Sequence, residues 1–215
     1  CALPISGPSV HYLESRNYTE PLFVFAIMVV AASKPILHWA TSVVNAITFV
    51  LHRALKLPMA PINFWLLLSV IPLLGSLITE PAAMTLAALL LSRQVFSQSN
   101  DVAFKYATLG VLFVNVSVGG ALTSFAAPPI LMVAGAWSWD TATVFQLLGL
   151  KAIAVVVVNA FALTLFWRKQ IPVISATRTE AMPWIVQVVH GLFLLGVVVF
   201  AHHPVVFLKI GRAHV

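Results

Sequence analysis

Long apolar blocks leave this chain few ways to fold. A helix of roughly 17–25 apolar residues spans the hydrocarbon core of a bilayer. Hydrophobic residues make up 60% of the chain and charged residues only 8%, which excludes a soluble domain. The sequence therefore predicts an all-α polytopic membrane protein. Its predicted elements cover residues 20–51 (kinked or split near Pro35), 62–95, 102–136, 144–167 and 184–201.

The residues at the two ends of the sequence are expected to differ in origin from those between them. Residues 1–5 and 210–215 can be encoded by the two strands of one common sequencing adapter, read in opposite directions. We therefore expect these ends to be library-derived and exclude them from the fold. Residues 6–209 are then expected to be a fragment of a longer membrane domain.

Loop cations predict the orientation of the helices, because cytoplasmic loops are rich in lysine and arginine. The connection 137–143 carries only Asp140. The 62–95 block must then enter and leave on the cytoplasmic side, as a helical hairpin with its tip at 79–82. The cations are scattered between apolar runs, which argues against a nucleic-acid partner. Those that set this topology are Arg53, Lys56, Arg93, Lys105, Arg168, Lys169 and Arg178.

Glu80 is the acidic residue that falls inside an apolar block, between Thr79 and Pro81. An ionisable group at membrane depth is costly and by default functional. Pro81 suits the first turn of the returning helix, which leaves Thr79 and Glu80 beside exposed backbone groups. Two interpretations stay open. Glu80 caps the returning helix and interacts with its dipole, or it binds a cation in competition with a proton.

A second polar interruption lies within the 102–136 block. Paired glycines ease departure from helical geometry, and the paired prolines Pro128 and Pro129 restart a helix. We predict a broken helix that is unwound over 115–129, because irregular backbone at this depth must be buried or line a cavity. The alternative is a glycine packing face with a proline kink. The predicted lining residues are Asn115, Ser117, Gly119, Gly120, Thr123 and Ser124.

Other polar residues inside the helices carry weaker predictions. Lys151 lies about two turns inside the 144–167 helix, as a charge partner for Glu80 or as a snorkelling side chain. Asn45 and Asn159 are expected to hydrogen-bond between helices. No resident metal site and no cofactor is expected.

The phrase from Asn115 to Pro129, with its glycine and proline pairs, resembles the ion transporter superfamily of antiporters, arsenite permeases and carboxylate carriers. Within it, Asn17-Tyr18-Thr19-Glu20-Pro21 and Ile78-Thr79-Glu80-Pro81-Ala82-Ala83-Met84 look most like the bacterial sodium/proton antiporter family. The resemblance covers most of residues 17–208. It implies a re-entrant hairpin and a broken helix, each with an inverted copy in the half of the chain that is missing here.

The resemblance also implies a function. Carboxylate carriers typically have Ser-Asn-Thr at the hairpin tip, whereas this chain has Thr79-Glu80-Pro81, and an acidic tip favours a cation or proton. We expect a secondary Na⁺/H⁺ antiporter of the bacterial inner membrane, working by alternating access with Glu80 as the shared group. Its partners would be lipid, a small inorganic ion, a proton and the missing half, with a homodimer left open. The alternatives are an organic-anion or oxyanion carrier and a non-transporting scaffold. An enzyme is not expected, because nucleophile-elbow and zinc-protease motifs are absent from this sequence.

Overall fold

A computed structural model describes residues 25, 28–172 and 183–199, and every regular element in this part of the chain is helical. The predicted all-α class is therefore confirmed. The elements are α3 (Lys34–Leu55), α4 (Met59–Ile78), α5 (Glu80–Leu91), η1 (Ser92–Phe96), α6 (Val102–Gly119), η2 (Gly120–Leu122), α7 (Pro128–Trp137), α8 (Thr141–Val144), η3 (Phe145–Gly149), α9 (Leu150–Phe166) and α10 (Trp184–Val199). Residues 1–5 and 210–215 lie outside the described ranges.

Proline and glycine positions explain several helix boundaries. Ser33 is extended, and α3 begins at Lys34 with Pro35 in its first turn, where the missing amide costs no hydrogen bond. The first predicted helix is thus interrupted where its proline falls. Pro81 and Pro128 occupy the equivalent first-turn positions of α5 and α7.

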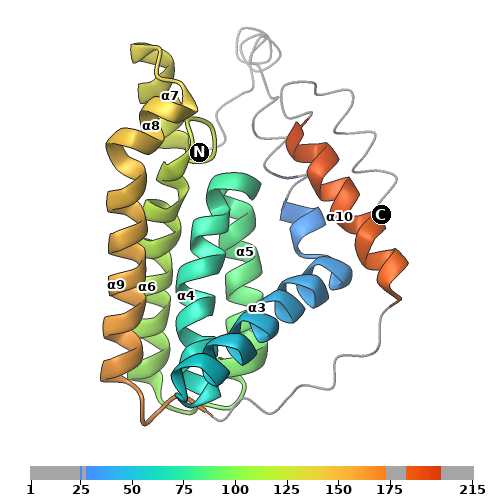
Figure 1. The fold of residues 1–215 in the computed structure, drawn as a ribbon, viewed down its shortest axis with the longest axis vertical. Helices are drawn as coiled ribbons and strands as arrows, with labels where there is room; N and C mark the ends of the chain where they lie inside the picture. The colour runs from blue at the N-terminus through green and yellow to red at the C-terminus, as the bar shows by residue number, and fades with distance from the viewer. Residues whose placement is uncertain (1–24, 26–27, 173–182, 200–215) are drawn as a thin grey trace, which may run out of the picture.

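The helices α4, α5, α6 and α9 stand side by side (Figure 1). The chain rises in α4, returns in α5, rises again in α6 and returns through α8, η3 and α9. An aromatic cluster ties the lower ends together: Phe64 of α4 lies 5.5 Å from Phe104 of α6, and Phe104 lies 5.7 Å from Trp167 (ring centroids). Helix α3 packs across α4, and α10 packs against α3.

Polar side chains also join the helices. Asn63 of α4 donates a 3.1 Å hydrogen bond to Asn45 of α3, and the indole of Trp65 donates to the carbonyl of Val157 in α9. The interhelical role predicted for Asn45 is confirmed. In an apolar surrounding, such bonds fix which helix faces lie against each other.

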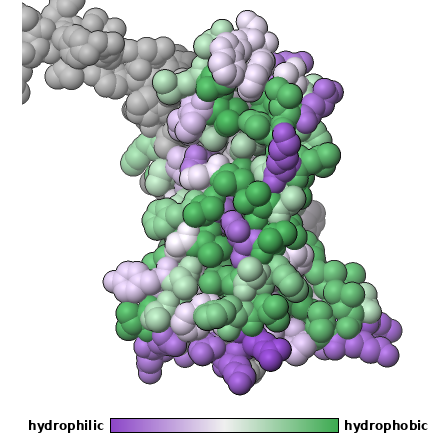
Figure 2. All heavy atoms as spheres, turned by 90° about the vertical axis from the view of Figure 1, so that its left-hand side faces the viewer, coloured by the Kyte–Doolittle hydropathy of each residue, from purple (hydrophilic) through white to green (hydrophobic). Residues whose placement is uncertain are grey.

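Among the described residues, three helical stretches are long and apolar enough to cross a membrane: Met59–Ile78, Val102–Leu122 and Thr141–Phe166. The face of the bundle that α9 forms is apolar over most of its height, with a hydrophilic border at its lower end (Figure 2). A surface of this kind suits contact with lipid chains. The chain is a multi-pass membrane protein.

Candidate functional site

The site begins at Thr79, the single residue between α4 and α5. Its backbone has φ 78° and ψ 151°, a region that is normally reserved for glycine. A β-branched residue there is strained by about 1–3 kcal/mol. The side chain is buried, and its hydroxyl oxygen has no hydrogen-bond partner. Thr79 therefore combines a strained backbone with an unsatisfied polar atom at the tip of the hairpin.

Glu80 follows as the first residue of α5 and is half-buried. It is the acidic residue in the first turn of α5, whose N-cap Thr79 makes no side-chain cap hydrogen bond. Its carboxylate accepts a 2.7 Å hydrogen bond from the hydroxyl of Ser117 on α6. The backbone amide of Glu80 donates to the carbonyl of Ala126, at 3.3 Å. The hairpin tip thus contacts the 102–136 segment on both sides of its interruption: Ser117 in α6 before it, and Ala126 shortly before α7.

That interruption is shorter than predicted. Helix α6 continues to Gly119, so Asn115 and Ser117 lie on regular helix, and the expected unwinding from residue 115 is wrong. One 3₁₀ turn follows, Thr123 is extended, and α7 begins at Pro128. The helical hydrogen bonding of α6 continues to Gly119, and the carbonyls at this helix end still have partners. The carbonyl of Gly119, for example, accepts from the hydroxyl of Ser76.

The paired glycines allow close approach and do not supply unusual backbone angles. Gly119 and Gly120 both have right-handed helical φ values, −62° and −65°. A Cβ on Gly119 would lie 2.6 Å from the carbonyl oxygen of Pro72, and one on Gly120 would lie 2.9 Å from the Cβ of Ala127. The packing interpretation thus holds for these glycines, while the helix still breaks immediately after them.

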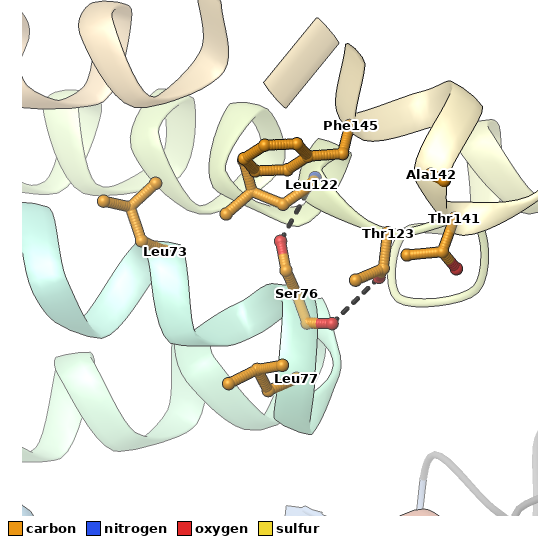
Figure 3. A pocket seen from close by; sticks show the side chains of 8 residues that line it. All are labelled: Leu73, Ser76, Leu77, Leu122, Thr123, Thr141, Ala142 and Phe145. Carbon is orange, nitrogen blue, oxygen red and sulfur yellow. Dashed lines mark hydrogen bonds between the residues drawn. The ribbon is translucent and has the colours of Figure 1, made fainter. Parts of the chain in front are cut away.

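Ser76, which the sequence analysis missed, joins the two interruptions (Figure 3). Its hydroxyl donates to the carbonyl of Gly119 and accepts from the amide of Leu122, at 3.2 Å. Its own carbonyl accepts a 2.8 Å hydrogen bond from the hydroxyl of Thr123. A small polar residue one turn before the acidic tip was the available sequence signal.

An open pocket of about 500 Å³ lies beside these bonds. Apolar side chains line most of it, among them Leu77 and Phe145, and Ser76 and Thr123 form part of its wall (Figure 3). Ser124, at the outer side of the break, shares a 3.0 Å hydrogen bond with the hydroxyl of Thr141.

Asn115 is fully buried, and its amide is occupied by protein groups. Its nitrogen donates to the carbonyls of Leu68 (2.8 Å) and Val156 (3.2 Å), and its oxygen accepts from Asn159. Pro72 has no amide hydrogen, so the Leu68 carbonyl lacks its usual helical donor. Asn115 supplies that donor, and the predicted interhelical role of Asn159 is confirmed.

The sequence model of the family described as "Putative Na+/H+ antiporter" matches residues 5–211. The chain belongs to this family. No curated protein and no solved structure matches it. Membership implies a transporter rather than an enzyme, and the family description names sodium and protons as the exchanged ions.

Two further expectations concern charge in this antiporter-family chain. Lys151 lies on the exposed surface of α9, and no ion pair joins it to Glu80 among the residues that the structure describes. In the same part of the chain, no group of three or more His, Cys, Asp or Glu side chains is arranged to hold a metal ion. A cation at this site would therefore rely on one carboxylate together with hydroxyl and backbone oxygens.

Proposed function

We propose that this chain carries half of the ion pathway of a secondary Na⁺/H⁺ antiporter, in which Na⁺ and a proton compete for the carboxylate of Glu80. The observation that carries the proposal is the hydrogen bond from Ser117 to Glu80, at the point where the hairpin tip meets the broken helix. A carboxylate held between helices is available for a transported ion.

Two hydroxyl oxygens suited to a hard cation belong to residues beside this carboxylate in space or in sequence. The hydroxyl of Ser117 lies in direct contact with it, and the buried hydroxyl of Thr79 lacks a partner one residue away. Na⁺, like other hard cations, prefers carboxylate, hydroxyl and carbonyl oxygens. A bound cation would satisfy the Thr79 hydroxyl that the protein leaves unpaired. Asn115 is not included among the ligands because its amide nitrogen donates to two backbone carbonyls and its oxygen accepts from Asn159.

The depth of the hairpin tip supports a re-entrant arrangement. From the aromatic cluster, Thr79 lies fifteen residues after Phe64, and Gly119 lies fifteen after Phe104. At 1.5 Å per residue, Thr79 and Gly119 each lie about 22 Å from the aromatic cluster, measured along their helices. The 26-residue stretch Thr141–Phe166 is about 39 Å long on the same scale.

The tip therefore lies short of the opposite end of the bundle. Helix α4 alone is long enough to count as a span, but the chain turns at Thr79 and α5 brings it back. In this proposal the tip lies inside the bilayer, and an inverted second half completes the cavity. Alternating access would then expose Glu80 to each side in turn, in a bacterial inner membrane.

The test is transport by the full-length protein in vesicles, with sodium gradients imposed and internal pH followed by a fluorescent dye. Glu80→Gln keeps the size and hydrogen-bonding capacity of the side chain but removes its titration, so we expect Na⁺-driven proton movement to fall to background. Glu80→Asp is the matched control and should retain part of the activity. Retained proton coupling in a correctly folded Glu80→Gln protein would refute the assignment.

A further inference from the structure

Most of the described lysines and arginines gather at one end of the bundle. The end of α3, the start of α4, the end of α5 with η1, the start of α6 and the end of α9 lie together at the lower end of Figure 1. Lys34 and Lys151 are the described cations placed elsewhere. Asp101, the described acid at this end, is used as the cap of α6 and accepts from the amide of Phe104. The cations of this basic end are Arg53, Lys56, Arg93, Lys105, Arg168 and Lys169.

Within the described residues, no ion pair neutralises this basic end. Arg168 and Lys169 follow Trp167, the C-cap of α9, and both side chains are exposed. Two adjacent cations at a membrane boundary, without an ion pair among the described residues, attract negative charge, at about 1 kcal/mol for each residue near the surface.

An apolar stripe leads along α9 to this pair. Val158, Phe161 and Leu165 recur at helical spacing, and each is more than half exposed (61%, 59% and 54%). Figure 2 faces this side of the bundle, where the apolar surface meets the hydrophilic lower border. Arg168 and Lys169 lie three and four residues after Leu165, so the spacing of the stripe leads to the cationic pair at its end.

We propose that this surface binds an anionic phospholipid, with an acyl chain along the α9 stripe and the phosphate at Arg168 and Lys169. Orientation accounts for cations on this side, but it does not require two of them in adjacent positions just beyond the end of the stripe. A free phosphate ion would contact only the cations and would leave the apolar stripe uncovered. The inference needs the chain to be embedded in a membrane and does not depend on the role of Glu80.

The purified protein can be tested by native mass spectrometry after exchange into phosphatidylglycerol or phosphatidylcholine. Two surface cations should give about a thirtyfold preference for retained phosphatidylglycerol over phosphatidylcholine. Arg168→Gln with Lys169→Gln should reduce that preference to below about twofold, whereas Lys151→Gln, which removes a charge from the same helix, should leave it unchanged. Phe161→Ser should weaken retention of both lipids.

Three results would overturn the proposal: no preference in the unmodified protein, an unchanged preference in the double variant, or equal displacement by millimolar inorganic phosphate. The first and third need no variant, so the proposal stays testable if a variant fails to fold. The exchanged pair Arg168→Lys with Lys169→Arg keeps both charges and should retain the preference.

Discussion

The hydroxyl of Ser117 on α6 donates a 2.7 Å hydrogen bond to the carboxylate of Glu80 at the start of α5. These residues lie 37 positions apart and in different apolar blocks. Their contact joins the hairpin tip to the helix that leads into the break. If the hairpin tip moves, this hydrogen bond must therefore break, or α6 must move together with the tip.

Ser117→Ala tests that contact directly. A hydrogen bond to a charged group contributes about 1.5–3 kcal/mol, and less where the donor is exposed, as Ser117 is. We expect the apparent affinity for Na⁺ to fall about fivefold, corresponding to about 1 kcal/mol. Sodium titration of transport in vesicles measures this change. Ser117→Thr keeps the hydroxyl and should stay near the unmodified value, as should Ser97→Ala far from the tip, and an unaffected Ser117→Ala protein would contradict the assignment.

Gly119→Ala tests the close approach of α6 to α4. The added methyl would lie 2.6 Å from the Pro72 carbonyl oxygen, so the helices must separate, which costs about 1–3 kcal/mol. Gly110→Ala is the matched control on the same helix, because no atom lies within 4 Å of its added Cβ. That variant should gain up to about 1 kcal/mol from helix propensity. Thermal unfolding in detergent compares them, and equal melting temperatures would mean that the helices are not this close.

Asn115→Ala should leave the Leu68 carbonyl unpaired inside the bundle, at a cost of about 1–3 kcal/mol. Pro72→Ala restores an amide hydrogen one turn after Leu68, so the double variant should lose less stability than the two single losses summed, by about 1 kcal/mol. Denaturant or thermal unfolding of the four proteins gives this coupling. Asn159→Ala, which removes the side-chain partner of Asn115, should show no such coupling with Pro72→Ala.

Asp140, the N-cap of α8, lies at the end of the bundle away from the basic end (Figure 1), and its capping hydrogen bond is expected to depend on pH. The hydrogen bonds from the side chain and the backbone amide of Thr143 hold the pKa of the Asp140 carboxyl below its ordinary value of 3.8. The folded pKa is depressed, so the cap contributes fully above about pH 4 and is lost as pH falls through the lower, folded value. Hydrogen exchange at the Thr143 amide, expressed as a protection factor, should decline over that acidic range. Asp140→Asn keeps a capping side chain and should give a protection that does not change with pH.

Local composition and spacing were sufficient to predict the membrane class and most helix positions. Apolar blocks of spanning length have no stable alternative in lipid, because every backbone group must be paired within helices. The interruptions at Thr79–Pro81 and before Pro128–Pro129 could also be located, since proline removes a donor and fixes φ wherever it occurs. Local composition and spacing did not show which polar residues only stabilise the bundle and which face the candidate site.

Tertiary structure decided those roles, because they depend on which helix faces meet. Asn115 was predicted to line the ion site, but α4 places the unpaired carbonyl of Leu68 against it, and its amide is used there. Gly119 was expected to ease unwinding, but the proximity of Pro72 makes it a packing residue on regular helix. Ser76 gained its role only when Gly119 and Leu122 came within hydrogen-bond distance of its hydroxyl. The sequence by itself determined where the chain must be helical and where helices must stop, whereas contacts between residues distant in sequence determined what each interruption faces.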